Sequence, residues 1–170
     1  MRISRRLFGL VAAGALATMC SLAGGQPAHA NGWFVIKNLG TGECLQPDPS
    51  DTTDVGVRLV QEPCHADTVV AQRWTVLTAP DGQHTQFQNQ STQGCMDAHG
   101  PNADHTPVDT WPCSGISNQR WTFGPFSPSY VVSVIGNRCL DVLGGSSEDG
   151  TVIEIFHCLS PDLTQGWFIE

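Results

Sequence analysis

The side chains with the clearest potential for chemistry are six cysteines that occur in three similar pairs. The members of each pair lie 20, 18 and 19 residues apart: Cys44 and Cys64, Cys95 and Cys113, Cys139 and Cys158. An even number of cysteines at repeated spacing in a short exported chain is typical of a disulfide framework. Six cysteines allow many connectivities, and the simplest joins the members of each pair. Zinc sites use closer cysteine spacings, so no metal is expected.

A Gln-x-Trp triplet follows each cysteine pair. The triplets are Gln72-Arg73-Trp74, Gln119-Arg120-Trp121 and Gln165-Gly166-Trp167, and their tryptophans lie 47 and then 46 residues apart. This recurrence indicates three copies of one unit that bury a shared core. We expect the three tryptophans to lie in that core. The glutamines have two interpretations: a structural amide that satisfies buried backbone groups, or a contact to a ligand.

The charged residues are distributed unevenly along the chain, which has 170 residues and a formal net charge of −8. Residues 31–170 hold five basic and 16 acidic side chains, a net charge of −11. This field repels polyanions, so nucleic acid and anionic membrane surfaces are not expected partners. A neutral ligand is indifferent to the charge.

The first thirty residues have the features of an export signal. Three arginines come first: Arg2, Arg5 and Arg6. An apolar stretch at 7–23 follows, and Ala28-His29-Ala30 has the small-x-small pattern of a cleavage site. We therefore expect a secreted chain that begins at Asn31 and has lost Cys20 with its leader. A membrane anchor is the alternative interpretation, but the stretch is short and weakly hydrophobic. The paired arginines leave the export route open.

Short segments rich in β-branched and aromatic residues indicate strands in the remainder of the chain. Such segments lie at 33–36, 130–135 and 151–156, with turns at 39–42, 80–82, 144–145 and 148–150. No helical hydrophobic period appears after residue 31. The pattern predicts an all-β barrel or sandwich.

The three units resemble the ricin-B-type (R-type) lectin family. The residues that carry this resemblance are Cys139-Leu140-Asp141-Val142 in the third unit, and Cys95-Met96-Asp97-Ala98, Trp111-Pro112-Cys113 and Asn118-Gln119-Arg120-Trp121 in the second. The resemblance covers 33–170. It implies a β-trefoil, with repeats at about 33–78, 83–124 and 129–170. It also implies a domain that binds galactose-type or xylan-type glycans without metal or other cofactor.

The resemblance further implies a sugar site in each unit, with three conserved positions. These are the Asp two residues after the first cysteine, the aromatic residue two before the second, and the Asn beside the triplet. A carboxylate accepts charge-assisted hydrogen bonds from hydroxyls, a ring covers the apolar face of a pyranose, and an amide offers both a donor and an acceptor. The second unit has every part: Asp97, Trp111, Asn118 and Gln119.

The other two units are less complete. The third keeps Asp141, Phe156 and Gln165, but Thr164 stands where Asn is expected. The first unit has none of the three side chains, because its residues there are Gln46, Glu62 and Ala71. We therefore rank the units second, third, first as sugar sites.

Several of these residues also have a plain structural interpretation. Asp97 and Asp141 could cap turns, and Trp111 could be ordinary packing. His99 and His105 lie between Asp97 and Trp111 in the sequence and could line the same sugar site. A metal site around these histidines is not expected, because the spacing matches no known ligand pattern.

Two other functions remain as alternatives to a non-catalytic lectin. A glycoside hydrolase needs a positioned pair of carboxylates, and 16 acidic residues make accidental pairs unavoidable. A protein-binding trefoil, such as a protease inhibitor, could use the loop at 47–51, because a fold does not fix a function. The main expectation is a secreted, monomeric lectin, and the sequence does not identify its sugar.

Overall fold

The structure is a computed structural model that describes residues 32–124 and 128–170. The predicted export signal at 1–30 lies outside the described residues. The first repeat contains β1 (Ile36–Asn38), β2 (Cys44–Pro47), β3 (Val57–Glu62) and β4 (Trp74–Thr78). The second contains β5 (Thr85–Asn89), β6 (Cys95–Asp97), β7 (Thr106–Pro107), β8 (Asp109–Trp111) and β9 (Trp121–Phe123). The third contains β10 (Ser129–Ser133), β11 (Arg138–Val142), β12 (Ile153–His157) and β13 (Gly166–Ile169).

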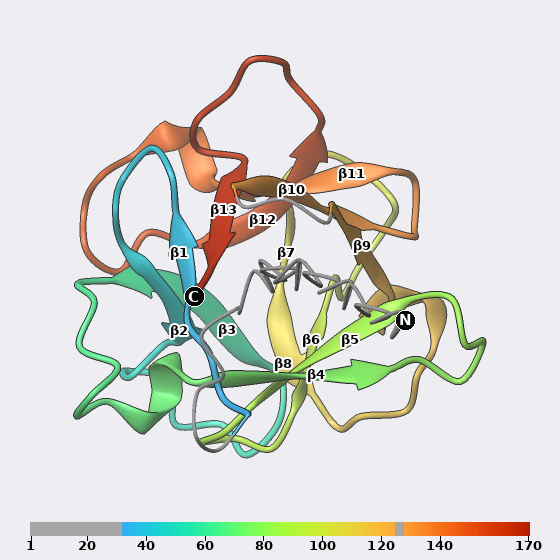
Figure 1. Cartoon of the computed structure of the whole chain (residues 1–170), viewed down its shortest axis with the longest axis horizontal. Coiled ribbons are helices and arrows are strands. Elements are labelled where there is room, and N and C mark those ends of the chain that lie inside the picture. Colours follow the sequence, from blue (N-terminus) through green and yellow to red (C-terminus); the bar gives the residue numbers. More distant parts are fainter. Residues whose placement is uncertain (1–31, 125–127) are drawn as a thin grey trace, which may run out of the picture.

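The outer strands of the three repeats form a closed barrel. Antiparallel pairing runs from β4 to β5, β9, β10, β13 and β1 in turn. Backbone hydrogen bonds of 2.9 and 2.8 Å between Phe34 and Trp74 then close the ring. Figure 1 shows β13 lying beside β1 where the end of the chain meets its first strand. A closed ring leaves none of these six strands with an unpaired edge.

The inner strands of each repeat form a hairpin that caps the barrel. The hairpins are β2–β3, β6–β8 and β11–β12. They also pair with one another, through β3–β8, β12–β7 and a bridge between Val60 and Val152. A barrel capped by three mutually paired hairpins is a β-trefoil. The predicted fold is therefore confirmed, and of the two all-β alternatives the barrel is correct.

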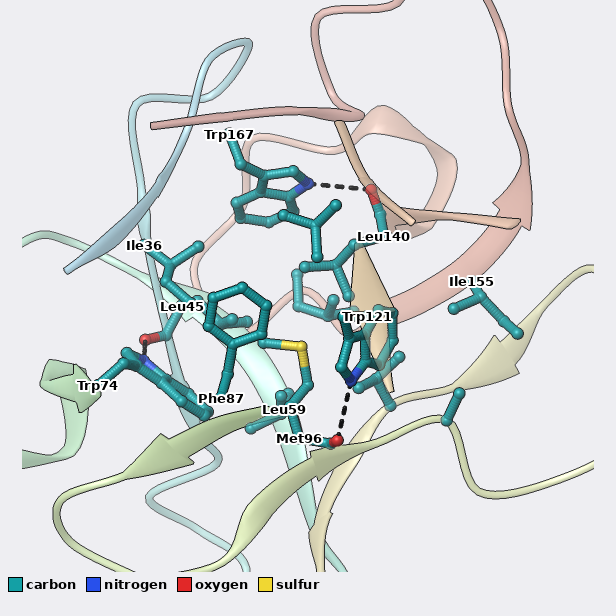
Figure 2. Close-up of a cluster of buried hydrophobic side chains, with 14 of the residues drawn as sticks. Ile36, Leu45, Leu59, Trp74, Phe87, Met96, Trp121, Leu140, Ile155 and Trp167 are labelled. Atoms are coloured by element: carbon teal, nitrogen blue, oxygen red, sulfur yellow. Dashed lines mark hydrogen bonds between the residues drawn. The ribbon is translucent and has the colours of Figure 1, made fainter. Parts of the chain in front are cut away.

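The tryptophans of the three triplets occupy the core, as predicted (Figure 2). Each indole N–H donates to the carbonyl of the residue after the first cysteine of its own repeat. Trp74 binds Leu45 at 3.0 Å, Trp121 binds Met96 at 3.0 Å, and Trp167 binds Leu140 at 2.9 Å. Each tryptophan thus fastens the start of a barrel strand to a cap hairpin without leaving a buried N–H unpaired.

One disulfide joins the two cysteines of each repeat, as expected from the spacing: Cys44–Cys64, Cys95–Cys113 and Cys139–Cys158. Each links the first strand of a cap hairpin to the chain just beyond its second strand. Closing a loop of this length contributes roughly 3 kcal/mol by restricting the unfolded chain.

Three short 3-10 turns complete the described residues: η1 (Val70–Gln72), η2 (Ser117–Gln119) and η3 (Leu143–Gly145). η1 and η2 bring a triplet glutamine to the start of its barrel strand. Within the described ranges, no helix is long and apolar enough to cross a membrane.

We predict that Trp121→Phe lowers the free energy of unfolding by about 2–4 kcal/mol. The change leaves a cavity in the core and removes the donor to the Met96 carbonyl. Chemical denaturation measures the loss. Val76→Ala, at a side chain that is 43% exposed, serves as the control and is expected to cost less than about 1 kcal/mol. Equal effects of the two changes would contradict this role of the indole.

Candidate functional site

The glutamine of the second triplet lies beneath the candidate site and does not reach its surface. Gln119 is fully buried. Its Nε2 donates to Asp97 Oδ2 and to the Pro112 carbonyl, both at 3.0 Å. Its Oε1 accepts from the backbone N–H groups of Ser114 and Gly115 at 2.8 and 3.1 Å. The amide is therefore occupied by the fold.

The other two triplet glutamines make the corresponding bonds. Gln165 Nε2 donates to Asp141 Oδ2 at 2.9 Å and to the His157 carbonyl at 3.1 Å. Gln72 Nε2 donates to Gln46 Oε1 at 2.9 Å. Of the two interpretations of Gln119 and Gln165, the structural amide and the ligand contact, the structure favours the first. Both amides are buried and saturated, so they position the aspartates.

The third repeat places its candidate side chains around one recess of about 320 Å³. Asp141 on β11 and Phe156 on β12 line it, together with Glu154, Asp162 and Thr164. Asp141 lies directly opposite Glu154 in the β11–β12 register. Glu154 and Phe156 are two residues apart on one strand, so their side chains share a face. The recess therefore combines two carboxylates and a ring.

Thr164, which stands where Asn is expected, contacts Asp141. Its Oγ1 lies 3.0 Å from Asp141 Oδ1 and 2.8 Å from Asp162 Oδ1. The other Asp141 oxygen accepts from the Gln165 amide, and the Val142 backbone also bonds to this carboxylate. The two oxygens carry four lone pairs in total, so the carboxylate retains capacity to accept a ligand hydroxyl.

His105 belongs to the second repeat but lies in the third-repeat recess. Its Nδ1 is 3.0 and 3.1 Å from the two carboxylate oxygens of Glu154. Its ring centroid is 4.8 Å from that of Phe156. The sequence suggested that His105 lines the site of its own repeat. The placement differs because β7 pairs with β12 of the next repeat, which no spacing within one repeat reveals.

The second repeat brings its candidate side chains onto one face but distributes them over separate hollows. Asp97 lies opposite Asp109 in the β6–β8 register, with Trp111 two residues further along β8. Trp111 lines a recess of about 300 Å³ with Asp54 and Val55 of the first repeat. Asp109 lines another of about 330 Å³, with Arg58 among its walls.

The indole of Trp111 is half-buried between two neighbours. A Cβ placed on Gly56 would lie 2.9 Å from the indole Cζ3, so the ring packs against the backbone there. On another side His99 meets the ring edge-on, with centroids 4.8 Å apart. His99 Nδ1 also lies 3.6 Å from Asp109 Oδ2.

Asn118 braces the turn beside the second-repeat site. Its Nδ2 donates to the Ala98 carbonyl at 3.2 Å, and its side chain is partly exposed. Gln46 and Glu62 stand in the first repeat where the other repeats have an aspartate and a ring. The Gln46 side chain is buried against Gln72.

The carboxylates of both sites are held in an environment that disfavours their charge. Burial raises the pKa of Asp97, Asp141 and Glu154 above the ordinary range. The pKa of Asp109 rises to about 6, first through burial and then through the neighbouring charge of Asp97. Asp109 Oδ1 is also buried without a hydrogen-bond partner. Perturbed acids of this kind mark candidate functional sites.

Asp109 and Glu154 were not anticipated from the sequence. Both lie four residues before the second cysteine of their repeat and two before the aromatic residue. The period of two along a strand places them beside that ring, so the signal was present. The first repeat has Val60 at this position.

The carboxylates do not gather into a metal site. Residues 32–124 and 128–170 contain no group of three or more His, Cys, Asp or Glu side chains that could hold a metal ion. The carboxylates instead suit sugar hydroxyl groups, because ionised carboxylates accept hydrogen bonds from hydroxyls while a ring covers the adjacent apolar carbons.

We predict that Asp109→Asn stabilises the protein at pH 7 by about 1–3 kcal/mol. The folded pKa of about 6 exceeds the ordinary 3.8, so the folded state binds this proton more tightly than the unfolded state. Ionisation therefore costs stability as pH rises through about 4 to 6, by at most about 3 kcal/mol. Denaturation at pH 4 and pH 7 measures the difference, and the gain should nearly vanish at pH 4.

The exposed Asp54→Asn is the matched control and should change stability little at either pH. An Asp109→Asn variant that is no more stable than the parent at pH 7 would contradict the assigned environment.

Solved structures share this fold at low sequence identity. The designed threefold-symmetric protein ThreeFoil matches with a TM-score of 0.73 and 20% identity, over 81% of this chain and 97% of that chain. The ricin B-like lectin of Macrolepiota procera, solved with lactose, matches with a TM-score of 0.68 and 19% identity, over 81% and 94%. An exo-β-1,3-galactanase from Clostridium thermocellum matches with a TM-score of 0.71 and 20% identity, over 81% of this chain but 29% of that chain.

No curated protein matches the chain. Comparison with family models, however, supports the relationship seen in the solved structures. The family model described as the ricin-type beta-trefoil lectin domain matches residues 32–167. The match spans most of the chain and includes all three Gln-x-Trp triplets. The chain therefore belongs to the ricin-type β-trefoil lectin domain family.

Proposed function

We propose that the protein is a secreted, non-catalytic lectin that binds neutral galactose-type or xylan-type glycans, with its best-formed site in the third repeat. The observation that carries this proposal is the shared recess of Asp141, Glu154 and Phe156. Family membership supports carbohydrate binding, and the lactose complex of the Macrolepiota procera lectin supports a galactose-type ligand.

The recess has the three elements that a neutral pyranose requires. Asp141 retains free lone pairs for hydroxyls on one edge of the sugar. Glu154 lies opposite it and offers a second acceptor. Phe156 presents a partly exposed ring to the apolar C–H face. Gln165 and Thr164 hold Asp141 in place, so its orientation is set before a ligand arrives.

The second repeat supplies a second site in this proposal, but the ranking changes. Its side chains match the family pattern more fully, which favoured it on sequence alone. In the structure Trp111 packs against Gly56 and lines a hollow shared with the first repeat. The third repeat gathers its ring and carboxylates around one recess, so we rank it first.

The proposed sites imply weak binding of single sugars. A monosaccharide has about a dozen heavy atoms, and about −0.3 kcal/mol per atom gives roughly −4 kcal/mol, near a millimolar Kd. Two sites on one chain can engage the same polymer, which raises the apparent affinity. A polysaccharide is therefore the expected partner of a protein that acts as a monomer.

The proposed absence of catalysis follows from where the carboxylates lie. Asp141 and Glu154 are direct neighbours on adjacent strands, as are Asp97 and Asp109. A glycosidase needs its two carboxyl groups on either side of the scissile bond. Three disulfides support export to an oxidising compartment.

We predict that the purified protein releases no chromophore from aryl β-galactosides, β-xylosides or α-arabinosides. Prolonged incubation at pH 5 and pH 7, with a known glycosidase as positive control, measures this. Turnover that disappears in Glu154→Gln would contradict the non-catalytic assignment.

We predict that Asp141→Asn weakens binding of lactose or xylobiose in the third repeat about 10- to 100-fold. The change keeps the acceptor for Gln165 but removes the charge that strengthens hydrogen bonds from the sugar. Phe156→Ala should have a similar effect by removing the ring. Calorimetry with each sugar, in a Trp111→Ala background that disables the second site, measures both.

Glu62→Gln changes the first-repeat counterpart of Phe156 and serves as the matched control, with unchanged affinity expected. Galactan and xylan retention on an affinity matrix provides the initial screen. A parent protein that binds none of these glycans, or variants that bind them unchanged, would overturn the proposed function.

A further inference from the structure

We propose that His99 and His105 control sugar access to the two sites by competing with the ligand for the ring and the buried carboxylate of each. This inference rests on the proposed function. Neither histidine belongs to the Asp, ring and Asn pattern of the repeats. The structure nevertheless places one imidazole in each site, in contact with both groups that a sugar would contact.

In the third-repeat recess, His105 bridges Glu154 and Phe156. Its Nδ1 is within 3.1 Å of both Glu154 oxygens, and its ring lies 4.8 Å from the phenyl ring. The Glu154 side chain is 5% exposed, whereas that of His105 is 64% exposed. The carboxylate is therefore fixed, and the imidazole has room to leave toward solvent.

In the second-repeat site, His99 makes the equivalent pair of contacts. Its Nδ1 lies 3.6 Å from Asp109 Oδ2, and its ring meets the Trp111 indole at 4.8 Å. Its side chain is also more than half exposed, while Asp109 is largely buried. Each site thus contains a buried carboxylate and an aromatic ring, and an exposed imidazole contacts both of them.

The two histidines reach these places from unrelated positions. His99 lies four residues after the first cysteine of its repeat, where the third repeat has Leu143. His105 comes from the segment before β7, and the corresponding segment beside β8 carries Gly56. Repetition of one sequence pattern cannot account for the shared arrangement. The common factor is the carboxylate four residues before the second cysteine.

The backbone at His105 supports a specific role for this side chain. Its φ is 63°, a left-handed conformation that glycine and asparagine adopt more readily than histidine. Its N–H donates to the Ile155 carbonyl at 3.1 Å, which holds the segment against β12. The imidazole is presented to the recess despite a small conformational cost.

Protonation decides how strongly each imidazole competes. Histidine can gain a charge between about pH 5 and 8. A charged imidazolium pairs more strongly with the carboxylate than a neutral ring does, and it also adds attraction to the aromatic face. The sugar must then displace an ion pair. Lower pH therefore closes each site for as long as its carboxylate stays ionised. Because burial raises the pKa of Asp109 to about 6 and that of Glu154 above its ordinary value, the ion pair is lost again once the carboxylate itself is protonated.

Other charged groups surround each histidine. Asp97 on β6, Asp109 on β8 and Arg58 on β3 lie around His99. Glu154 on β12, Asp141 on β11 and Asp162 before β13 line the recess with His105. Asp104 precedes His105 and is paired with Arg138 and His157. Carboxylates thus predominate near both imidazoles.

The test compares sugar binding at pH 5.5 and pH 7.5 in histidine variants of the full chain. The third-repeat recess is measured in the Trp111→Ala background, with lactose and xylobiose as probes. His105→Gly copies the Gly56 position and suits the backbone, and His105→Asn keeps a neutral donor. Both variants should bind at least threefold more tightly than their parent at pH 5.5 and within twofold of it at pH 7.5.

The second-repeat site is measured in the Phe156→Ala background with His99→Ala. A gain in the same direction but smaller is expected at pH 5.5, because the pKa of Asp109 is about 6 and much of this carboxyl is neutral there. His65→Asn, an exposed histidine of the first repeat, is the matched control and should leave both affinities unchanged. Thermal unfolding verifies that each variant is folded. Histidine variants that bind as their parent does at both pH values, or more weakly at pH 5.5, would overturn this inference alone. A parent that binds neither sugar would overturn the proposed function as well.

Discussion

The buried amide of each triplet glutamine is the interaction on which the rest of the structure depends. In every repeat it ties the start of a barrel strand to both strands of the cap hairpin. Gln119 does so through Asp97 and the Pro112 carbonyl, and Gln165 through Asp141 and the His157 carbonyl. The tryptophan two residues later fastens the same hairpin from below through its indole N–H. Removing either partner would leave buried polar groups unpaired, which is costly.

This constraint also explains where the candidate sites lie. The amide must bind an acceptor two residues after the first cysteine, so an aspartate there serves the fold and is also available to the proposed site. The first repeat satisfies the same amide with Gln46, which keeps the fold and removes the charge. The structural bond at this position therefore does not require a charge. The second carboxylate, Asp109 or Glu154, is not held by the triplet amide, and burial raises its pKa.

The sequence was sufficient for the features that depend on spacing within one repeat. Recurrence of the cysteines and triplets predicts the buried tryptophans and makes pairing within each repeat the simplest disulfide pattern, whereas the β-trefoil was implied by the family resemblance. The burial of Gln119 and Gln165 could not be derived, because a glutamine in that place fits either a ligand or a buried backbone group. Spacing also could not place His105, since pairing between β7 and β12 joins different repeats. Our ranking of the two proposed sugar sites rests on the packing of Gly56 against Trp111. This contact joins different repeats, and no motif within one repeat records it.

The pairing of β7 with β12 has a consequence for how such a protein can evolve or be engineered. Because a residue of one repeat completes the recess of the next, the repeats are not interchangeable cassettes. Grafting the third repeat into another trefoil would transfer Asp141 and Phe156 but leave His105 behind. Recombination between lobes should therefore alter the walls of a recess in a neighbour whose own sequence is untouched.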